Sequence, residues 1–214
     1  MKEYRGKQFY SSDSEILAAR HTALIVVDLQ NDMGHPDGAF GPNQVADIVP
    51  SVDTTVRDAR ANGVLVVWLR NTVLPHNLSD SPAWLAFRSR HGFESLDFTV
   101  KGTWGHDLME PLEILPEDVV IDKHRSTGFV GTDLDSILRS NLIESVAVCG
   151  CMTEGCVEST VRDAAFRDYY TVVIKDLVRS NTPRLHELSL EVMSSQFRVR
   201  SAEEVTAAWS ESAG

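Results

Sequence analysis

Five short runs of apolar, largely β-branched residues constrain this fold more than any other feature. The runs show no polar alternation, and segments with helical spacing separate them. Such runs are typical of strands that are buried on both faces of a parallel sheet. The five runs are Ala23–Val27, Val64–Leu69, Val119–Ile121, Val146–Cys149 and Thr171–Ile174, and a weaker sixth run is Phe197–Val199.

The intervening segments alternate with these runs and predict helices. They span residues 45–61, 131–141, 156–167 and 183–195. Strand and helix in repeated alternation predict a three-layer α/β/α fold of the Rossmann-like type, with a mainly parallel six-stranded sheet and right-handed crossovers. The chain has 214 residues, 43% of them hydrophobic, and shows no internal repeat or linker, so we expect a single domain over residues 1–214.

One connection, residues 72–118, is too long to fit the regular alternation of strands and helices. Prolines and glycines interrupt it, and it is rich in aromatic residues: Trp84, Phe87, Phe93, Phe98 and Trp104. A connection of this length in a compact domain is often a functional cap. The alternative is a helix with loops that complete the core or form a subunit interface.

Charge and composition exclude several classes of partner. A formal net charge of −11 argues against nucleic acid and against anionic membrane surfaces. No segment approaches the roughly 20 apolar residues that span a bilayer, and the first 21 residues lack the apolar core of a signal peptide. We therefore expect a cytoplasmic protein. The three cysteines all lie within residues 149–156, which favours reduced thiols over a disulfide framework.

Three reactive side chains follow three of the predicted strands. Asp28 ends the first strand, Lys123 follows the third, and Cys156 opens the helix after the fourth. We place the ends of the second and fifth strands at Arg70–Asn71 and Lys175–Asp176. Because ligands bind beyond the carboxyl ends of parallel strands, we expect the aspartate, lysine and cysteine to converge at one edge.

Together these three side chains can activate a thiol. Asp28 can take the proton of Cys156, and Lys123 favours the anionic form of both groups. The first-turn position of Cys156 also lowers a thiol pKa and provides backbone N–H groups for an oxyanion. Singly, each residue has an ordinary interpretation as a turn former, a surface charge or core packing, so only their convergence favours a site.

Other interpretations of the cysteine segment fit less well. Cys149 packs within a strand, and Cys151 lies before the helix, away from its dipole. Zinc would need a second Cys or His pair at ligand spacing. The C-x₅-R pattern of residues 156–162 lacks the glycine-rich loop that a phosphate needs. We therefore expect neither a metal nor a cofactor.

Three blocks of the sequence resemble the isochorismatase-like cysteine hydrolases over roughly residues 20–180. The blocks are TALIVVDLQND, VVIDKHRSTGFVGTDLDSILRS and GCMTEGCVESTVRDAAFRDY. The resemblance implies a catalytic triad of Asp28, Lys123 and Cys156. It also implies a cis peptide entering Met152, which would place the amides of Met152 and Cys156 as an oxyanion hole.

Departures from the family pattern indicate the branch. The Asp-x-His metal motif of the nicotinamidases is absent from WLRNTVLPHN, and the cysteine that true isochorismatases generally lack is present. The chain is most similar to the ureidoacrylate amidohydrolases and their biuret and N-carbamoyl relatives. Where ureidoacrylate members tend to have Thr-Asn, this chain has Thr153–Glu154. The acidic side chain of Glu154 favours a neutral or cationic substrate.

We expect hydrolysis of a small amide or urea through a Cys156 thioester. The candidate substrate contacts are Arg70, Asn71, Arg125, Thr153 and Glu154. The alternatives are a nicotinamidase-like deamidase, an isochorismatase-type vinyl-ether hydrolase and a non-catalytic binding module on the same fold. Family members usually form dimers or tetramers, so we expect a homo-oligomer, with the 72–118 connection and the helix around Val205–Trp209 as candidate contacts.

Overall fold

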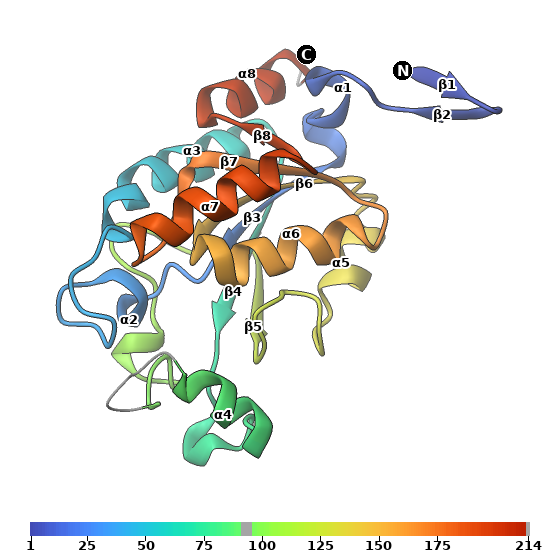
Figure 1. Ribbon diagram of the computed structural model, residues 1–214. Coiled ribbons are helices and arrows are strands. Elements are labelled where there is room, and N and C mark those ends of the chain that lie inside the picture. Colours follow the sequence, from blue (N-terminus) through green and yellow to red (C-terminus); the bar gives the residue numbers. More distant parts are fainter. Residues whose placement is uncertain (91–95, 213–214) are drawn as a thin grey trace.

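A six-stranded parallel sheet forms the centre of the computed structural model, which describes residues 1–90 and 96–212. The strand order is β5-β4-β3-β6-β7-β8, and every neighbouring pair is parallel (Figure 1). Each of the six predicted runs lies in or overlaps one strand, so the predicted α/β fold is confirmed. The strands are β3 Thr22–Val27, β4 Leu65–Asn71, β5 Val119–Lys123, β6 Ser145–Cys151, β7 Tyr170–Arg179 and β8 Arg198–Arg200.

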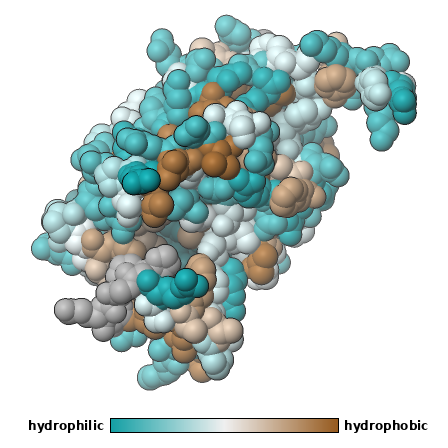
Figure 2. Space-filling view, in the orientation of Figure 1, coloured by the Kyte–Doolittle hydropathy of each residue, from teal (hydrophilic) through white to brown (hydrophobic). Residues whose placement is uncertain are grey.

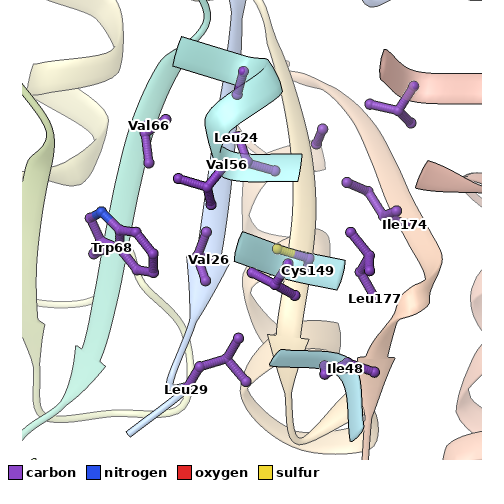
Figure 3. Close-up of a cluster of buried hydrophobic side chains, with 14 of the residues drawn as sticks. Leu24, Val26, Leu29, Ile48, Val56, Val66, Trp68, Cys149, Ile174 and Leu177 are labelled. Atoms are coloured by element: carbon purple, nitrogen blue, oxygen red, sulfur yellow. The ribbon is translucent and has the colours of Figure 1, made fainter. Parts of the chain in front are cut away.

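Both faces of the sheet are buried, which explains the unbroken apolar runs. All six residues of β3 are buried, and successive residues point into two separate cores. Leu24 and Val26 belong to one core, together with Val56 and Trp68 (Figure 3). The alternate residues of β3 belong to the other core.

Helices cover the two faces in separate groups. α3 (Val49–Ala61) and α8 (Ala202–Ser212) bury apolar residues in the first core. The second core is covered by α5 (Leu134–Ser140), α6 (Glu158–Ala165) and α7 (Pro183–Ser194). The four predicted helical segments therefore each contain a helix. None of the helices in the described residues is both long and apolar enough to cross a bilayer.

The remaining helical elements are short. The structure contains the α-helices α1 Asp13–Ile16, α2 Asn31–Gly34 and α4 Pro82–Ser89, the 3₁₀ turns η1 Ala19–His21, η2 Ala46–Ile48, η3 Pro75–Asn77 and η4 Trp104–His106, and the π-helical turn η5 Thr153–Val157.

The strand ends are aligned at one edge, apart from the end of β7. Val27 of β3 pairs with Leu69 of β4 and with Gly150 of β6. The predicted end of the fifth strand at Lys175–Asp176 is wrong, because β7 continues to Arg179 after a break in register opposite β6. The carboxylate of Asp176 instead accepts the backbone N–H of Ala202, where α8 begins.

The 72–118 connection contributes both to the core and to the molecular surface. Phe98 is buried in the first core, whereas Phe87 and Trp104 are about half exposed. Phe93 lies outside the described residues. α4 lies beyond the carboxyl ends of β4 and β5 (Figure 1), and Arg88 at its end forms a buried ion pair with Asp80.

The expected role of the C-terminal helix in self-association stays a prediction, but Val205 and Trp209 cannot provide its contacts. Val205 and Trp209 of α8 are fully buried in the first core of their own chain. Their apolar side chains fill the space beside α3 and β7, so they are not available to a partner.

An N-terminal hairpin was not predicted from the sequence. β1 (Lys2–Tyr4) and β2 (Lys7–Phe9) form a two-stranded antiparallel sheet that projects from the body (Figure 1). Every residue in both strands is exposed. Buried apolar runs therefore could not reveal it.

Gly150 permits the close contact between β6 and β3, and we expect Gly150→Ala to destabilise the fold. Its φ is +113°, and an added Cβ would lie 2.1 Å from the backbone oxygen of Val27. Overpacking of about 1–3 kcal/mol and a left-handed backbone penalty of about 1–2 kcal/mol should both lower the free energy of unfolding. Urea unfolding followed by circular dichroism measures the change.

Gly155→Ala is the matched control for that measurement. An added Cβ there meets only the Cβ of Met152, at an ordinary 3.8 Å. We expect its stability to stay close to that of the wild type. A Gly150→Ala variant as stable as Gly155→Ala would contradict the assigned role of Gly150.

Candidate active site

The side chains of Asp28, Lys123 and Cys156 meet at the carboxyl edge of the sheet. The ammonium Nζ of Lys123 lies 2.8 Å from Oδ2 of Asp28 and 3.2 Å from Sγ of Cys156. Asp28 follows β3, Lys123 ends β5, and Cys156 lies in η5 after β6. The three residues that we expected to converge from their places after the strands therefore do lie together.

The sheet order explains why the cation is a lysine. β5 is separated from β3 by β4, so the side chain must reach across about two strand spacings of ~4.8 Å each. Lys123 is fully buried, and its ammonium has three donor hydrogens. Its three acceptors are Asp28, Cys156 and the backbone oxygen of Arg125, the last at 3.2 Å.

Lys123 stays charged in this buried position. Burial lowers the pKa of its ammonium, but the Asp28 carboxylate and the Cys156 sulfur raise that pKa more, to a net value above the ordinary one. A raised pKa in the folded state contributes stability at every pH below the usual lysine value of about 10.4. That contribution is lost only as the pH rises through the higher folded value.

Asp28 is held by its backbone and keeps free acceptor capacity. Its φ of +52° lies in the left-handed region, which is uncommon for a residue other than glycine. Its N–H donates to the backbone oxygen of Leu69 at 2.9 Å. Apart from the ion pair with Lys123, neither carboxylate oxygen has a hydrogen-bond partner among the described residues. The carboxylate can therefore accept a proton.

The thiol of Cys156 is protonated in the free chain, contrary to the expected net lowering of its pKa. Burial and the Asp28 carboxylate raise the pKa of this thiol to about 12, although Lys123 acts in the opposite direction. The sequence predicted the sign of the Lys123 effect but not the larger cost of burying a thiolate. The neutral thiol and the charged ammonium therefore coexist at neutral pH.

The backbone before Cys156 differs from a regular helix start. Helical structure begins at Thr153, three residues before the predicted helix start at Cys156. The peptide between Cys151 and Met152 is cis, as the family resemblance implies. The backbone oxygen of Met152 accepts the N–H groups of Gly155 and Val157, at 3.0 and 3.2 Å.

The other two cysteines are buried and reduced. Burial raises the pKa of the Cys149 thiol and of the Cys151 thiol, so both stay neutral. The Cys151 thiol donates to the backbone oxygen of Asp28 at 3.1 Å, which ties the ends of β6 and β3 together.

Structural contacts already engage three of the candidate substrate residues. Arg70 forms an ion pair with Asp122 at 2.7 Å. The Asn71 amide donates to the hydroxyl of Thr99 at 2.7 Å. Arg125 lies with its guanidinium 4.8 Å from the ring centroid of Trp84, on the long connection. Their role in substrate binding stays a prediction.

The side chains of Thr153 and Glu154 differ in whether they keep an unused hydrogen-bond acceptor. Thr153 is fully buried, and its hydroxyl lies 2.8 Å from Nδ1 of His186. Oε1 of Glu154 accepts the hydroxyl of Ser180 at 2.8 Å, whereas its buried Oε2 has no hydrogen-bond partner among the described residues. Glu154 therefore presents an unused acceptor two residues from Cys156.

Gln30 is a positioning residue that the sequence analysis did not single out. It is fully buried, and its side-chain amide donates to the backbone oxygens of Asn71 and His106, at 3.0 and 2.9 Å. It thus joins the end of β4 to the long connection. Its place two residues after Asp28, within VVDLQND, is the signal that could have revealed it.

Within residues 1–90 and 96–212, no cluster of three or more His, Cys, Asp or Glu side chains is arranged to hold a metal ion. The side chains that meet at this edge supply a thiol, a carboxylate and an ammonium. Such a set can transfer a proton and form a covalent bond to an electrophilic carbon.

Comparisons with known proteins find a matching family model and similar chains. A family model described as the isochorismatase domain matches residues 22–204. The chain is 34% identical to ureidoacrylate amidohydrolase RutB of Enterobacter sp. (strain 638) over 181 residues, which is 78% of each chain.

Two solved structures show the same fold. A cysteine hydrolase from Pseudomonas syringae pv. phaseolicola 1448A superposes with a TM-score of 0.81 at 27% identity, covering 91% of this chain and 94% of the other. The pyrazinamidase of Pyrococcus horikoshii in complex with zinc superposes with a TM-score of 0.72 at 31% identity, covering 85% and 99%.

Replacing Lys123 with methionine should both destabilise the chain and change the thiol. The buried Asp28 carboxylate would lose its counter-ion, which typically costs about 3–5 kcal/mol of unfolding free energy. Because Lys123 lowers the pKa of Cys156, the pH profile of alkylation should move to higher pH. Urea unfolding and mass spectrometry of the alkylated Cys156 peptide measure the two effects.

Lys175→Met is the control, because Lys175 is exposed on β7. We expect it to change neither the stability nor the alkylation profile. A Lys123→Met variant with an unshifted alkylation profile would show that the ammonium does not act on the thiol.

Proposed function

This chain belongs to the isochorismatase family, and we propose that it is a cysteine amidohydrolase. The proposed reaction cleaves a C–N bond of a small ureido or carbamoyl compound through a thioester on Cys156. The contact of one ammonium with both a carboxylate and a thiol, at 2.8 and 3.2 Å, is the observation that carries this proposal.

The first step is attack by sulfur coupled to proton transfer. The Cys156 proton moves to Asp28 while sulfur forms a bond to the substrate carbonyl carbon. The electron pair of the C=O bond moves to oxygen. Because Lys123 contacts both the carboxylate and the sulfur, its positive charge lies beside both groups while the negative charge passes from the carboxylate, through sulfur, to the substrate oxygen.

The second step expels the leaving nitrogen. The backbone N–H groups of Met152 and Cys156 are the proposed donors to the tetrahedral oxyanion. When the oxyanion collapses, the C–N bond breaks and the proton held by Asp28 passes to nitrogen. Ammonia or an amine leaves, and the acyl group stays on sulfur as a thioester.

Water then releases the acyl group. Asp28 takes a proton from water, the hydroxide oxygen bonds to the thioester carbon, and the departing sulfur recovers a proton. A carbamoyl substrate yields a carbamate, which decays to carbon dioxide and ammonia. The chain returns to its thiol and carboxylate forms.

This coupling reconciles a thiol pKa of about 12 with nucleophilic catalysis. A free thiolate would be scarce at neutral pH. Transfer of the proton to an adjacent carboxylate does not require the thiolate to exist beforehand, because deprotonation and attack share one transition state. Substrate positioning therefore matters more than the resting ionisation of sulfur.

Two features support a ureido substrate. The curated relative named ureidoacrylate amidohydrolase is 34% identical to this chain. A ureido group also carries several N–H donors, and Oε2 of Glu154, two residues before Cys156 in the sequence, is an unused acceptor among the described residues. We propose that this oxygen accepts a substrate N–H, with Arg125 as a second contact beside Trp84.

A nicotinamidase-like deamidase is the second candidate. Its support is the 31% identity to a pyrazinamidase that was solved in complex with zinc. A substrate panel with a chelator separates the two, because the ureido proposal needs no metal.

Ammonia release should identify the substrate class. We expect wild-type protein to release ammonia from a ureido or carbamoyl member of a panel that also contains biuret and nicotinamide. Cys156→Ala should reduce kcat by at least about 10³-fold, since it removes the proposed nucleophile. A chelator should leave the wild-type rate unchanged. Cys149→Ala is the matched control and should retain activity.

The alternative outcomes are separable. Chelator-sensitive release from nicotinamide alone would favour the deamidase. Full activity of Cys156→Ala would exclude the thioester route. If folded wild-type protein releases no ammonia from any compound although Cys156 can be alkylated, the result would favour a non-catalytic binding module.

Glu154→Gln tests the proposed substrate contact. Loss of a charge-assisted hydrogen bond should raise KM for the ureido substrate about tenfold or more, with a smaller change in kcat. Steady-state kinetics beside exposed Glu187→Gln as a control measures this split. An unchanged KM would exclude Glu154 from substrate binding.

A further inference from the structure

The side chains of the hairpin of β1 and β2 are exposed in their own chain, although the Met1 ammonium beside β1 forms an ion pair with Glu15. All residues from 1 to 9 are exposed, and the two strands have three residues each. A lone two-stranded hairpin is marginally stable in water, because few contacts offset the entropy of ordering it. Something outside these two strands must cover this hairpin if it is to be a stable element.

One face of the hairpin is both cationic and aromatic. The register pairs Lys2 with Phe9 and Tyr4 with Lys7, and alternation along the strands puts these four residues on the same face. Tyr4 is 66% exposed and Phe9 is 40% exposed. The guanidinium of Arg5 lies 5.4 Å from the Tyr4 ring centroid, which adds a further positive charge.

α7 presents a surface of matching chemistry. Leu185, Leu188 and Val192 are each 44–46% exposed and lie at helical spacings of three and four, so they form one apolar stripe. Figure 2 shows this hydrophobic patch over α7. Exposed Glu187 and Glu191 border the stripe along one side. Arg184 lies in the first turn of the helix.

We propose that the hairpin docks on the α7 stripe of a second copy of this chain. Tyr4 and Phe9 contact the apolar stripe, and Lys2 and Lys7 pair with the two bordering glutamates. Each copy carries both surfaces, so two copies related by a two-fold axis form two identical contacts. The assembly is a closed dimer.

Charge selects a second copy as the occupant. Residues 1–9 carry a formal charge of +2, whereas residues 10–214 carry −13. The positively charged hairpin of one copy is therefore attracted to the acidic residues beside the α7 stripe of another copy, and this local attraction acts even though both copies have the same net charge. Within one chain the hairpin projects away from the body, and both surfaces stay exposed (Figure 1).

Reciprocal charge reversal tests the dimer. Sedimentation equilibrium of the full chain should show a wild-type dimer. Lys2→Glu with Lys7→Glu, and separately Glu187→Lys with Glu191→Lys, should each weaken self-association at least about tenfold, because like charges then face each other across both contacts. An equimolar mixture of the two variants should form a heterodimer as tight as the wild-type dimer, since opposite charges again meet at both contacts.

Matched controls separate this contact from general surface charge. Gln8→Glu changes the opposite face of the hairpin and should leave the dimer unchanged. Leu188→Glu should dissociate the dimer, whereas Leu142→Glu, at a 79% exposed position away from α7, should not. Unchanged circular dichroism melting shows that each variant is folded.

Three results would overturn the proposal. The first is a wild-type chain that is monomeric at 100-fold the concentration used for the activity assay. The second is an oligomer that both charge-reversed variants still form. The third is a pair of weakened variants that fail to associate when mixed.

Discussion

The buried ion pair between Lys123 and Asp28 is the interaction on which the carboxyl edge of the sheet depends. Both side chains are at most 1% exposed, and their Nζ–Oδ2 distance is 2.8 Å. Removing two charges from water is costly, and the mutual attraction compensates only when the remaining donors and acceptors are well placed. The ammonium meets this condition through three acceptors, whereas the carboxylate keeps unused oxygens. The carboxylate of this pair therefore keeps acceptor capacity that the fold itself does not use.

The topology of the sheet makes this pair possible. β3 lies between β4 and β6, so Asp28 is within reach of side chains from both directions. On one side, Lys123 extends across β4. On the other, the glycine at position 150 lets β6 approach β3, and the Cys151 thiol bonds to the backbone of Asp28. Strand ends thus fix Asp28 and Lys123, and the turn η5 that follows β6 holds Cys156.

The sequence predicted what depends on repeated burial and on strand ends. The strands were visible because both faces are buried, and the three converging residues followed from where those strands end. The continuation of β7 to Arg179 was not visible, since a break in register carries no apolar signal of its own. The hairpin was not predicted either, because its residues are exposed and give no buried apolar run. The net direction of the Cys156 pKa shift depends on the burial of the thiol. Burial follows from tertiary packing, so no local sequence pattern could predict it.

A protonated thiol has a consequence for selectivity. Thiolates are the form that oxidants and electrophiles attack, and the pKa of about 12 makes that form of Cys156 scarce at neutral pH. Activation then needs an electrophilic carbon held against sulfur with Asp28 ready to take the proton. In the proposed reaction, a substrate that places its carbonyl correctly supplies that condition. In the proposed reaction, the same burial that suppresses the resting nucleophile therefore restricts chemistry to ligands that fit.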